Sequence, residues 1–81
     1  HPREIFRTAI INGCAKIAIA HNHPSGDAEP SPQDYLVTER LIKASQILAI
    51  PIIDHCIIAS NFDGIQFYSM QDSRTFPMVP S

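Results

Sequence analysis

A short apolar run at residues 15–20, AKIAIA, constrains the fold more than any other part of the chain. The run has the length of a strand and only Lys16 is charged, so we predict a strand that is buried on both faces. Strands of this kind lie in sheets with helices packed against them. The chain is therefore predicted to have an α/β fold, with α+β as the borderline alternative.

Two helices are predicted, one on each side of this strand in the sequence. In residues 2–13, apolar side chains recur at helical spacing and Gly13 stands where a helix typically ends. Residues 32–49 carry apolar side chains at alternating steps of four and three, which is typical of an amphipathic helix. This pattern assigns Thr38 and Ser45 to the polar side of the second helix.

Two further strands are predicted near the end of the chain. Two β-branched runs, 52–59 and 64–69, are joined by turn-forming residues at 60–64, as in a hairpin. These strands make a small mixed sheet together with the first one. A sheet with helices on both sides usually has more than three strands, and the chain begins with His1 rather than Met. We therefore expect N-terminal strands of the fold to be missing.

Length and charge limit the domains and partners of this chain. With 81 residues it has room for one domain, predicted over residues 1–70, and residues 71–81 contain two prolines and are predicted to be a flexible tail. A net charge of −2 and scattered basic side chains disfavour direct nucleic-acid binding. No apolar run approaches the roughly 18–20 residues of a membrane span, so we predict a cytoplasmic protein without a membrane partner.

The residues after the first strand carry groups that suit a metal site. His21 and His23 are separated by one residue, so an extended backbone points both imidazoles to the same side. Asp34 falls in the first turn of the predicted second helix. Two histidines and one carboxylate hold zinc and leave one position open, as in catalytic rather than structural zinc sites. The sequence therefore predicts a zinc site on His21, His23 and Asp34, which supports metal-assisted hydrolysis of an amide bond.

The same residues also have a purely structural interpretation. Ser31 suits the N-cap of a helix, Pro32 suits the first helical position, and Asp34 is favourable against the positive end of the helix dipole. The two interpretations are compatible, because a cap can fix the turn that aims the carboxylate at a metal. His55 lies in a β-rich run, and we predict a hydrogen-bonded core histidine there rather than a fourth ligand.

The spacing of these residues resembles the zinc signature of a known family. Seven residues separate His23 from Ser31, and Asp34 follows three positions later. This is similar to the His-x-His-x7-Ser-x-x-Asp signature of the JAMM (MPN+) zinc metallopeptidases. Segments 1–6, 21–27 and 54–55 resemble the RadC-like branch of that family; they read HPREIF, HNHPSGD and DH.

The resemblance implies a fold, an activity and a set of site residues. A RadC-like JAMM (MPN+) domain is a deaminase-like α/β/α sandwich that binds zinc, here through His21, His23 and Asp34. Ser31 is implied as a catalytic residue that stabilises the tetrahedral intermediate in hydrolysis of a peptide or isopeptide bond of a protein or peptide substrate. RadC-like proteins also carry a historical DNA-repair label. The competing prediction is therefore a metal-free or catalytically silent interaction module in DNA metabolism.

The general base is not among the residues that carry the resemblance. Members of the family use a glutamate on an early strand, upstream of the histidines, so we expect this residue before His1. Glu4 is a weaker candidate, because a carboxylate in the first turn of a helix is favourable there without any chemistry. Asp27 and Glu29 lie in a loop, where carboxylates are usually just solvated. We expect this chain to bind zinc but to hydrolyse peptide bonds poorly.

Overall fold

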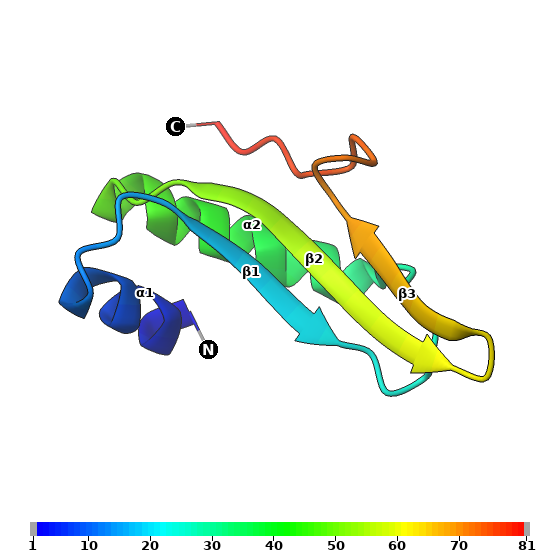
Figure 1. The fold of residues 1–81 in the computed structure, drawn as a ribbon. Coiled ribbons are helices and arrows are strands. Elements are labelled where there is room, and N and C mark those ends of the chain that lie inside the picture. The colour runs from blue at the N-terminus through cyan, green and yellow to red at the C-terminus, as the bar shows by residue number, and fades with distance from the viewer. Residues whose placement is uncertain (1, 81) are drawn as a thin grey trace.

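The computed structural model describes residues 2–80, so His1 and Ser81 lie outside the described residues. Between them, in chain order, lie the helix α1 (Pro2–Ile11), the strand β1 (Ile17–Asn22), the helix α2 (Pro32–Leu48), and the strands β2 (Ile52–Asn61) and β3 (Gly64–Ser69) (Figure 1). The predicted α/β class is confirmed, and so are the five predicted elements, although α1 ends two residues earlier and β1 is shifted by two residues.

The three strands form one small mixed sheet in the order β1-β2-β3. β1 pairs parallel to β2, with His21 opposite Ile57, and β2 pairs antiparallel to β3 through a tight hairpin. Parallel neighbours need a crossover connection, which α2 provides by running back along the sheet behind β2 (Figure 1). This crossover places the start of α2 beside the end of β1, where the candidate ligands lie.

Local signals explain where the helices end. Gly13 follows α1 with φ +65°, a left-handed conformation that glycine adopts without strain. Ala49 ends α2 in the same region, with φ 56°, and Pro51 cannot continue the helix. In the part of the chain that is described, neither helix has the length and apolar composition needed to cross a membrane.

Both helices contribute to a core on one face of the sheet. Phe6 of α1, Leu41 of α2 and Ile52 of β2 belong to one buried cluster, and Ile17 and Ile19 of β1 pack against it. A second buried cluster, under the first half of α2, is formed by Ala28, Ile57, Ala59 and Met70. Within residues 2–80 both helices therefore lie in one layer and the sheet forms a second. The second helical layer of an α/β/α sandwich is not among the described residues.

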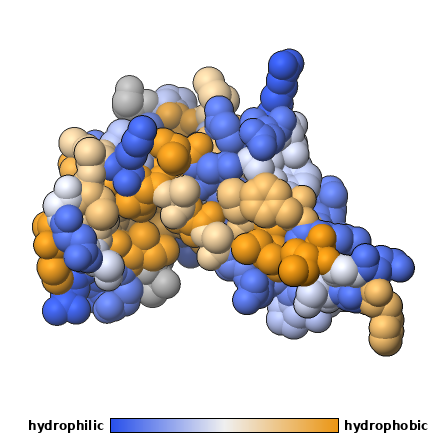
Figure 2. Space-filling view, in the orientation of Figure 1, coloured by the Kyte–Doolittle hydropathy of each residue, from blue (hydrophilic) through white to orange (hydrophobic). Residues whose placement is uncertain are grey.

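The prediction that β1 is buried on both faces is wrong. Its side chains alternate between half-buried and exposed. The half-buried ones are Ile17, Ile19 and His21, and the exposed ones are Ala18, Ala20 and Asn22. Apart from Lys16 the run is apolar, but its large apolar side chains, Ile17 and Ile19, point to the face that the helices cover. On the other face, hydrophobic side chains gather over β2 and β3 (Figure 2), and Ile65 and Phe67 are exposed.

Asp54 of β2 ties the sheet to the segment that follows β3. Its carboxylate accepts hydrogen bonds from the Ser69 hydroxyl and, at 3.0 Å, from the backbone N–H of Gln71. Burial raises the pKa of Asp54, but these bonds and those from Cys56 Sγ and the His55 N–H outweigh it, so the pKa lies below its ordinary value. Asp54 is therefore an ionised structural residue.

Residues 71–80 form turns and an irregular segment without helix or strand. Phe76 and Val79 pack against the core, and Gln46 Nε2 of α2 donates to the Val79 carbonyl at 2.8 Å. The predicted tail thus contacts the domain at several points, and its flexibility stays a prediction.

Candidate metal centre

Three candidate ligands meet where β1 ends and α2 begins. His21 is the last residue but one of β1, His23 follows the strand directly, and their ring centroids lie 5.0 Å apart. Asp34 lies in the first turn of α2. One ligand atom from each of the three residues lies within 4.8 Å of the other two. The structure thus brings together the residues that the sequence predicted as ligands.

The contacts between these residues involve specific atoms. His21 Nε2 lies 3.2 Å from Asp34 Oδ1, and His23 Nε2 lies 2.9 Å from Asp34 Oδ2. The side chains are 34%, 17% and 14% exposed for His21, His23 and Asp34. Most of each side chain is therefore held by protein, while the cluster remains accessible to an ion or a small substrate group from solvent.

The predicted helix start is also confirmed. Ser31 is the N-cap of α2: its Oγ accepts the Asp34 N–H at 3.2 Å, and Asp34 Oδ2 accepts the Ser31 N–H at 2.7 Å, which makes a capping box. The Ser31 hydroxyl donates to the same Oδ2 at 3.0 Å. The cap and the candidate metal centre coexist, because the cap holds the carboxylate that faces the two histidines.

These contacts keep Asp34 ionised. Burial alone raises the pKa of its carboxyl group, but the hydrogen bonds from the Ser31 backbone and hydroxyl, and then the charges of His21 and His23, outweigh burial. The pKa of Asp34 therefore lies below its ordinary value. At neutral pH the residue presents a carboxylate, which is the form that binds a metal.

Each histidine is also held through its second ring nitrogen. His23 Nδ1 lies 2.9 Å from the backbone oxygen of Asp27, and His21 Nδ1 lies 2.8 Å from Nε2 of His55 on β2. Both rings consequently direct Nε2 towards Asp34. Histidine ligands of metals almost always have such a partner on the other nitrogen, which fixes the orientation of the ring.

His55 is the hydrogen-bonded core histidine that the sequence predicted. It is 1% exposed and lies edge-on to His21, with ring centroids 4.9 Å apart. Burial, and next the charge of His21, lower the pKa of His55 below its ordinary value, so that it is a neutral imidazole at pH 7. Its Nδ1 is hydrogen-bonded to Thr38 Oγ1. Because both nitrogens have protein partners, His55 is not placed as a fourth ligand.

The prediction that Thr38 and Ser45 face solvent is wrong. Thr38 is fully buried and Ser45 is 6% exposed. Each hydroxyl donates to a backbone carbonyl of α2, at 2.7 Å to Asp34 and at 2.6 Å to Ile42, which makes burial of a polar side chain inexpensive. One sequence feature could have indicated that Thr38 lies near the cluster: it follows Asp34 by four residues, which places both on one side of a helix.

None of the weaker candidates for a general base joins the cluster. Glu4 is exposed on α1, Glu29 is exposed in the loop, and Asp27 Oδ1 accepts the Glu29 N–H at 2.9 Å. Within residues 2–80, the group of three or more candidate metal ligands is limited to His21, His23 and Asp34.

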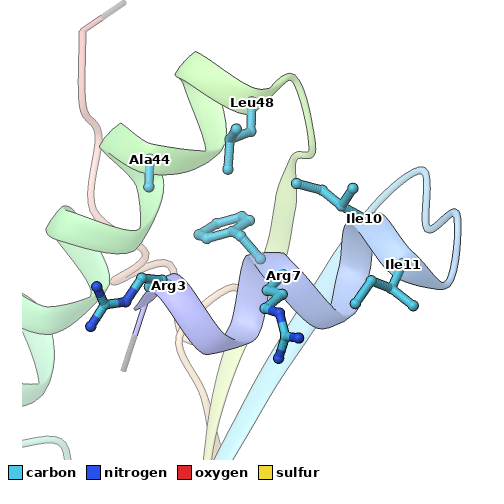
Figure 3. A pocket seen from close by; sticks show the side chains of 7 residues that line it. Arg3, Arg7, Ile10, Ile11, Ala44 and Leu48 are labelled. Carbon is cyan, nitrogen blue, oxygen red and sulfur yellow. The ribbon is translucent and has the colours of Figure 1, made fainter.

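The apolar hollow between the two helices is a separate feature (Figure 3). It has a volume of about 430 Å³ and is lined by Phe6, Ile10 and Leu48, with Arg3 and Arg7 at its edge. Leu48 is the last residue of α2, whereas Asp34 lies in its first turn, so the hollow is at the other end of this helix. It contributes no ligand to the candidate metal centre.

Known proteins resemble this chain over most of its length. The RadC-like JAB domain family matches residues 1–75. A UPF0758 protein of Picosynechococcus sp. is 52% identical over 67 residues, which cover 82% of this chain and 28% of the relative. A UPF0758 protein of Clostridioides difficile is 52% identical over 67 residues, which cover 83% of this chain and 27% of the relative. One of Methanosarcina acetivorans is 44% identical over 72 residues, which cover 89% of this chain and 30% of the relative. The chain spans less than a third of the length of these relatives.

Proposed function

The chain belongs to the RadC-like JAB domain family, and we propose that it forms the zinc-binding part of a hydrolase of peptide or isopeptide bonds. The observation that carries the proposal is the convergence of two imidazole Nε2 atoms on one ionised carboxylate, that of Asp34. These atoms are all electron-pair donors, and a bound cation satisfies them together.

The donor set favours zinc among the common metals. Imidazole nitrogens suit zinc better than they suit magnesium or calcium, which prefer oxygen ligands. His21, His23 and Asp34 are three protein ligands, and catalytic zinc typically keeps a further position open. When bound, zinc acts as a Lewis acid and lowers the pKa of water at its open position to about 7.

Ser31 is proposed as a residue that contacts the substrate. Its side chain is exposed beside Asp34, within reach of a substrate carbonyl that approaches the cluster. A hydroxyl in this place stabilises developing negative charge on the carbonyl oxygen. Since the Ser31 proton is directed at Asp34 Oδ2, the hydroxyl has to turn from the carboxylate to the substrate during the reaction.

The proposed substrate is a protein or a peptide. The proposed location of this protein is the cytoplasm. A hollow of about 320 Å³ borders His23 and combines apolar and polar walls, but its side chains lie on the face of the sheet opposite Asp34, because Asn22 and Ile58 are paired on that face. Ile58 and Ile65 supply apolar side chains, and Asn22 and Ser60 supply polar ones. The proposal of a protein or peptide substrate therefore rests on the RadC-like JAB domain family and not on this hollow.

One observation favours the competing function, a metal-free interaction module in DNA metabolism. The capping box gives Asp34 a structural role that needs no metal. Zinc analysis of purified, tag-free protein separates the two proposals. We expect stoichiometric zinc, and its loss when His21→Ala is combined with His23→Ala. Asn22→Ala is the matched control, because Asn22 lies between the two histidines and its side chain points away from them. Zinc content that survives the double substitution contradicts the proposed site.

Activity is tested by comparing this chain with its full-length relative from Picosynechococcus. The substrate is an isopeptide-linked protein at fixed zinc, with a chelator control for contaminating proteases. We expect chelator-sensitive cleavage by the relative and much weaker cleavage by this chain, because a positioned general base contributes about 10²–10⁴ in rate and no other carboxylate among residues 2–80 joins the cluster. Inert proteins that bind a defined protein partner support the interaction module instead.

A further inference from the structure

A chain of hydrogen bonds leaves the candidate metal centre and returns to it. His21 Nδ1 lies 2.8 Å from His55 Nε2, and His55 Nδ1 is hydrogen-bonded to Thr38 Oγ1. The Thr38 hydroxyl donates to the backbone carbonyl of Asp34 at 2.7 Å. This series of hydrogen bonds therefore begins at one candidate ligand, His21, and ends on the backbone of another, Asp34.

A metal on His21 Nε2 determines the direction of every bond in this chain. The Nε2 lone pair is then used by the metal, so the proton of the neutral His21 ring sits on Nδ1 and is donated to His55 Nε2. Neutral His55 accepts there and must donate from Nδ1 to Thr38 Oγ1. The single hydroxyl proton of Thr38 goes to the Asp34 carbonyl, which can only accept.

We propose that Thr38 and His55 are positioning residues that hold His21 in the tautomer and ring orientation needed for metal binding. The inference rests on the proposed metal site and concerns how the protein prepares it. Neither residue touches the metal. His23 needs no such series of hydrogen bonds through other side chains, because its Nδ1 donates directly to the Asp27 carbonyl. The two histidine ligands are thus supported independently.

Burial means that the Thr38 hydroxyl cannot easily be replaced as the hydrogen-bond partner of His55. Thr38 is fully buried and His55 is 1% exposed, and Met70, also fully buried, lies against Thr38 with its sulfur 3.7 Å from the hydroxyl oxygen. Water is therefore a poor substitute for the Thr38 hydroxyl. Among residues 2–80, no buried side-chain nitrogen or oxygen lacks a hydrogen-bond partner. Removing this hydroxyl leaves the Nδ1–H of His55 as an unpaired buried donor, which is unfavourable.

The first test reads the tautomers directly. Long-range ¹⁵N–¹H NMR spectra of the zinc-loaded protein distinguish Nδ1–H from Nε2–H in each imidazole. We expect His21, His23 and His55 all to carry the proton on Nδ1. A zinc-loaded protein in which His55 carries its proton on Nε2 overturns the inference and leaves the metal site intact. Absence of zinc-induced shifts at His21 and His23 instead removes the metal site, and the inference with it.

The second test measures zinc affinity by competition with a chelator. Thr38→Val keeps the shape of the side chain but removes the hydroxyl, and we expect a loss of about 10- to 100-fold, which is typical of changes to the partners of metal ligands. Thr38→Ser keeps the hydroxyl and should recover most of the affinity. Ser45→Ala is the matched control, since it removes another buried hydroxyl of α2 away from the cluster.

The spectra of Thr38→Val contain an internal control. The signals of His21 should shift relative to the parent protein, while those of His23 should not. Unchanged zinc affinity in folded Thr38→Val contradicts the proposed role. If this variant does not fold, the tautomer of His55 in the parent protein decides the question by itself.

Discussion

Replacing Asp34 by asparagine separates its two roles, because the structure predicts which way the new amide turns. Asp34 Oδ2 accepts two hydrogen bonds from Ser31, one from the backbone and one from the hydroxyl. Only the amide oxygen of asparagine can replace an acceptor, so it takes the Oδ2 position. The NH₂ group then occupies the Oδ1 position, which lies 3.2 Å from His21 Nε2. An N–H donor in that place forms a hydrogen bond to the lone pair of His21 Nε2, which a metal needs for coordination.

The expected magnitudes follow from this geometry. The metal loses a charged ligand, and His21 is blocked, so zinc affinity should fall by at least about tenfold, or about 1.4 kcal/mol of binding free energy. The capping bonds are retained, and α2 loses only the favourable interaction of a negative charge with its dipole, about 0.3–1 kcal/mol. For a domain of this size, that lowers the melting temperature of the metal-free protein by less than about 8 °C.

The assay combines chelator-competition titration of zinc with thermal melting of the metal-free protein. Glu39→Gln is the matched control, because it removes a negative charge from an exposed position of the same helix that is not part of the cluster. It should leave zinc affinity unchanged. If Asp34→Asn binds zinc as the parent does and only its melting temperature changes, Asp34 is a helix cap and not a ligand, and the proposed site is refuted.

Further outcomes follow from other contacts. Ser31→Ala removes the N-cap and should lower the free energy of unfolding by about 0.5–2 kcal/mol in denaturant titration; an unchanged midpoint contradicts the capping role. Zinc at 100 times its dissociation constant should add about 2.7 kcal/mol of stability, reversed by a chelator, and a melting temperature insensitive to zinc counts against the site. Leu41→Ala, at a fully packed core position, should cost about 2–5 kcal/mol, measured the same way. The lowered pKa of Asp54 stabilises the fold above about pH 4 and this contribution disappears as pH falls through the folded-state pKa, so Asp54→Asn should flatten the acid limb of a stability-against-pH curve; an unchanged limb refutes this assignment.

Much of the candidate site was predictable because it depends on local geometry. An extended backbone places residues i and i+2 on the same side, which is enough to pair His21 with His23. The start of α2 was equally visible, because Ser31 and Asp34 have the spacing of a capping box. Helix periodicity, apolar and β-branched runs, and turn residues likewise predicted the five elements from short stretches of sequence, without knowledge of their neighbours.

Other features depended on which elements pack together, and only the tertiary structure decided them. The apolar run in β1 does not reveal that both helices cover the same face, so the exposure of Ala18 and Ala20 was not foreseen. Thr38 looks polar in the helical pattern, yet it is buried because His55 arrives opposite it from a strand 17 positions away in the sequence. Local spacing determines where a side chain points, but burial and hydrogen-bond partners are set by residues that are distant in the chain, and these become neighbours only when the sheet and α2 pack together.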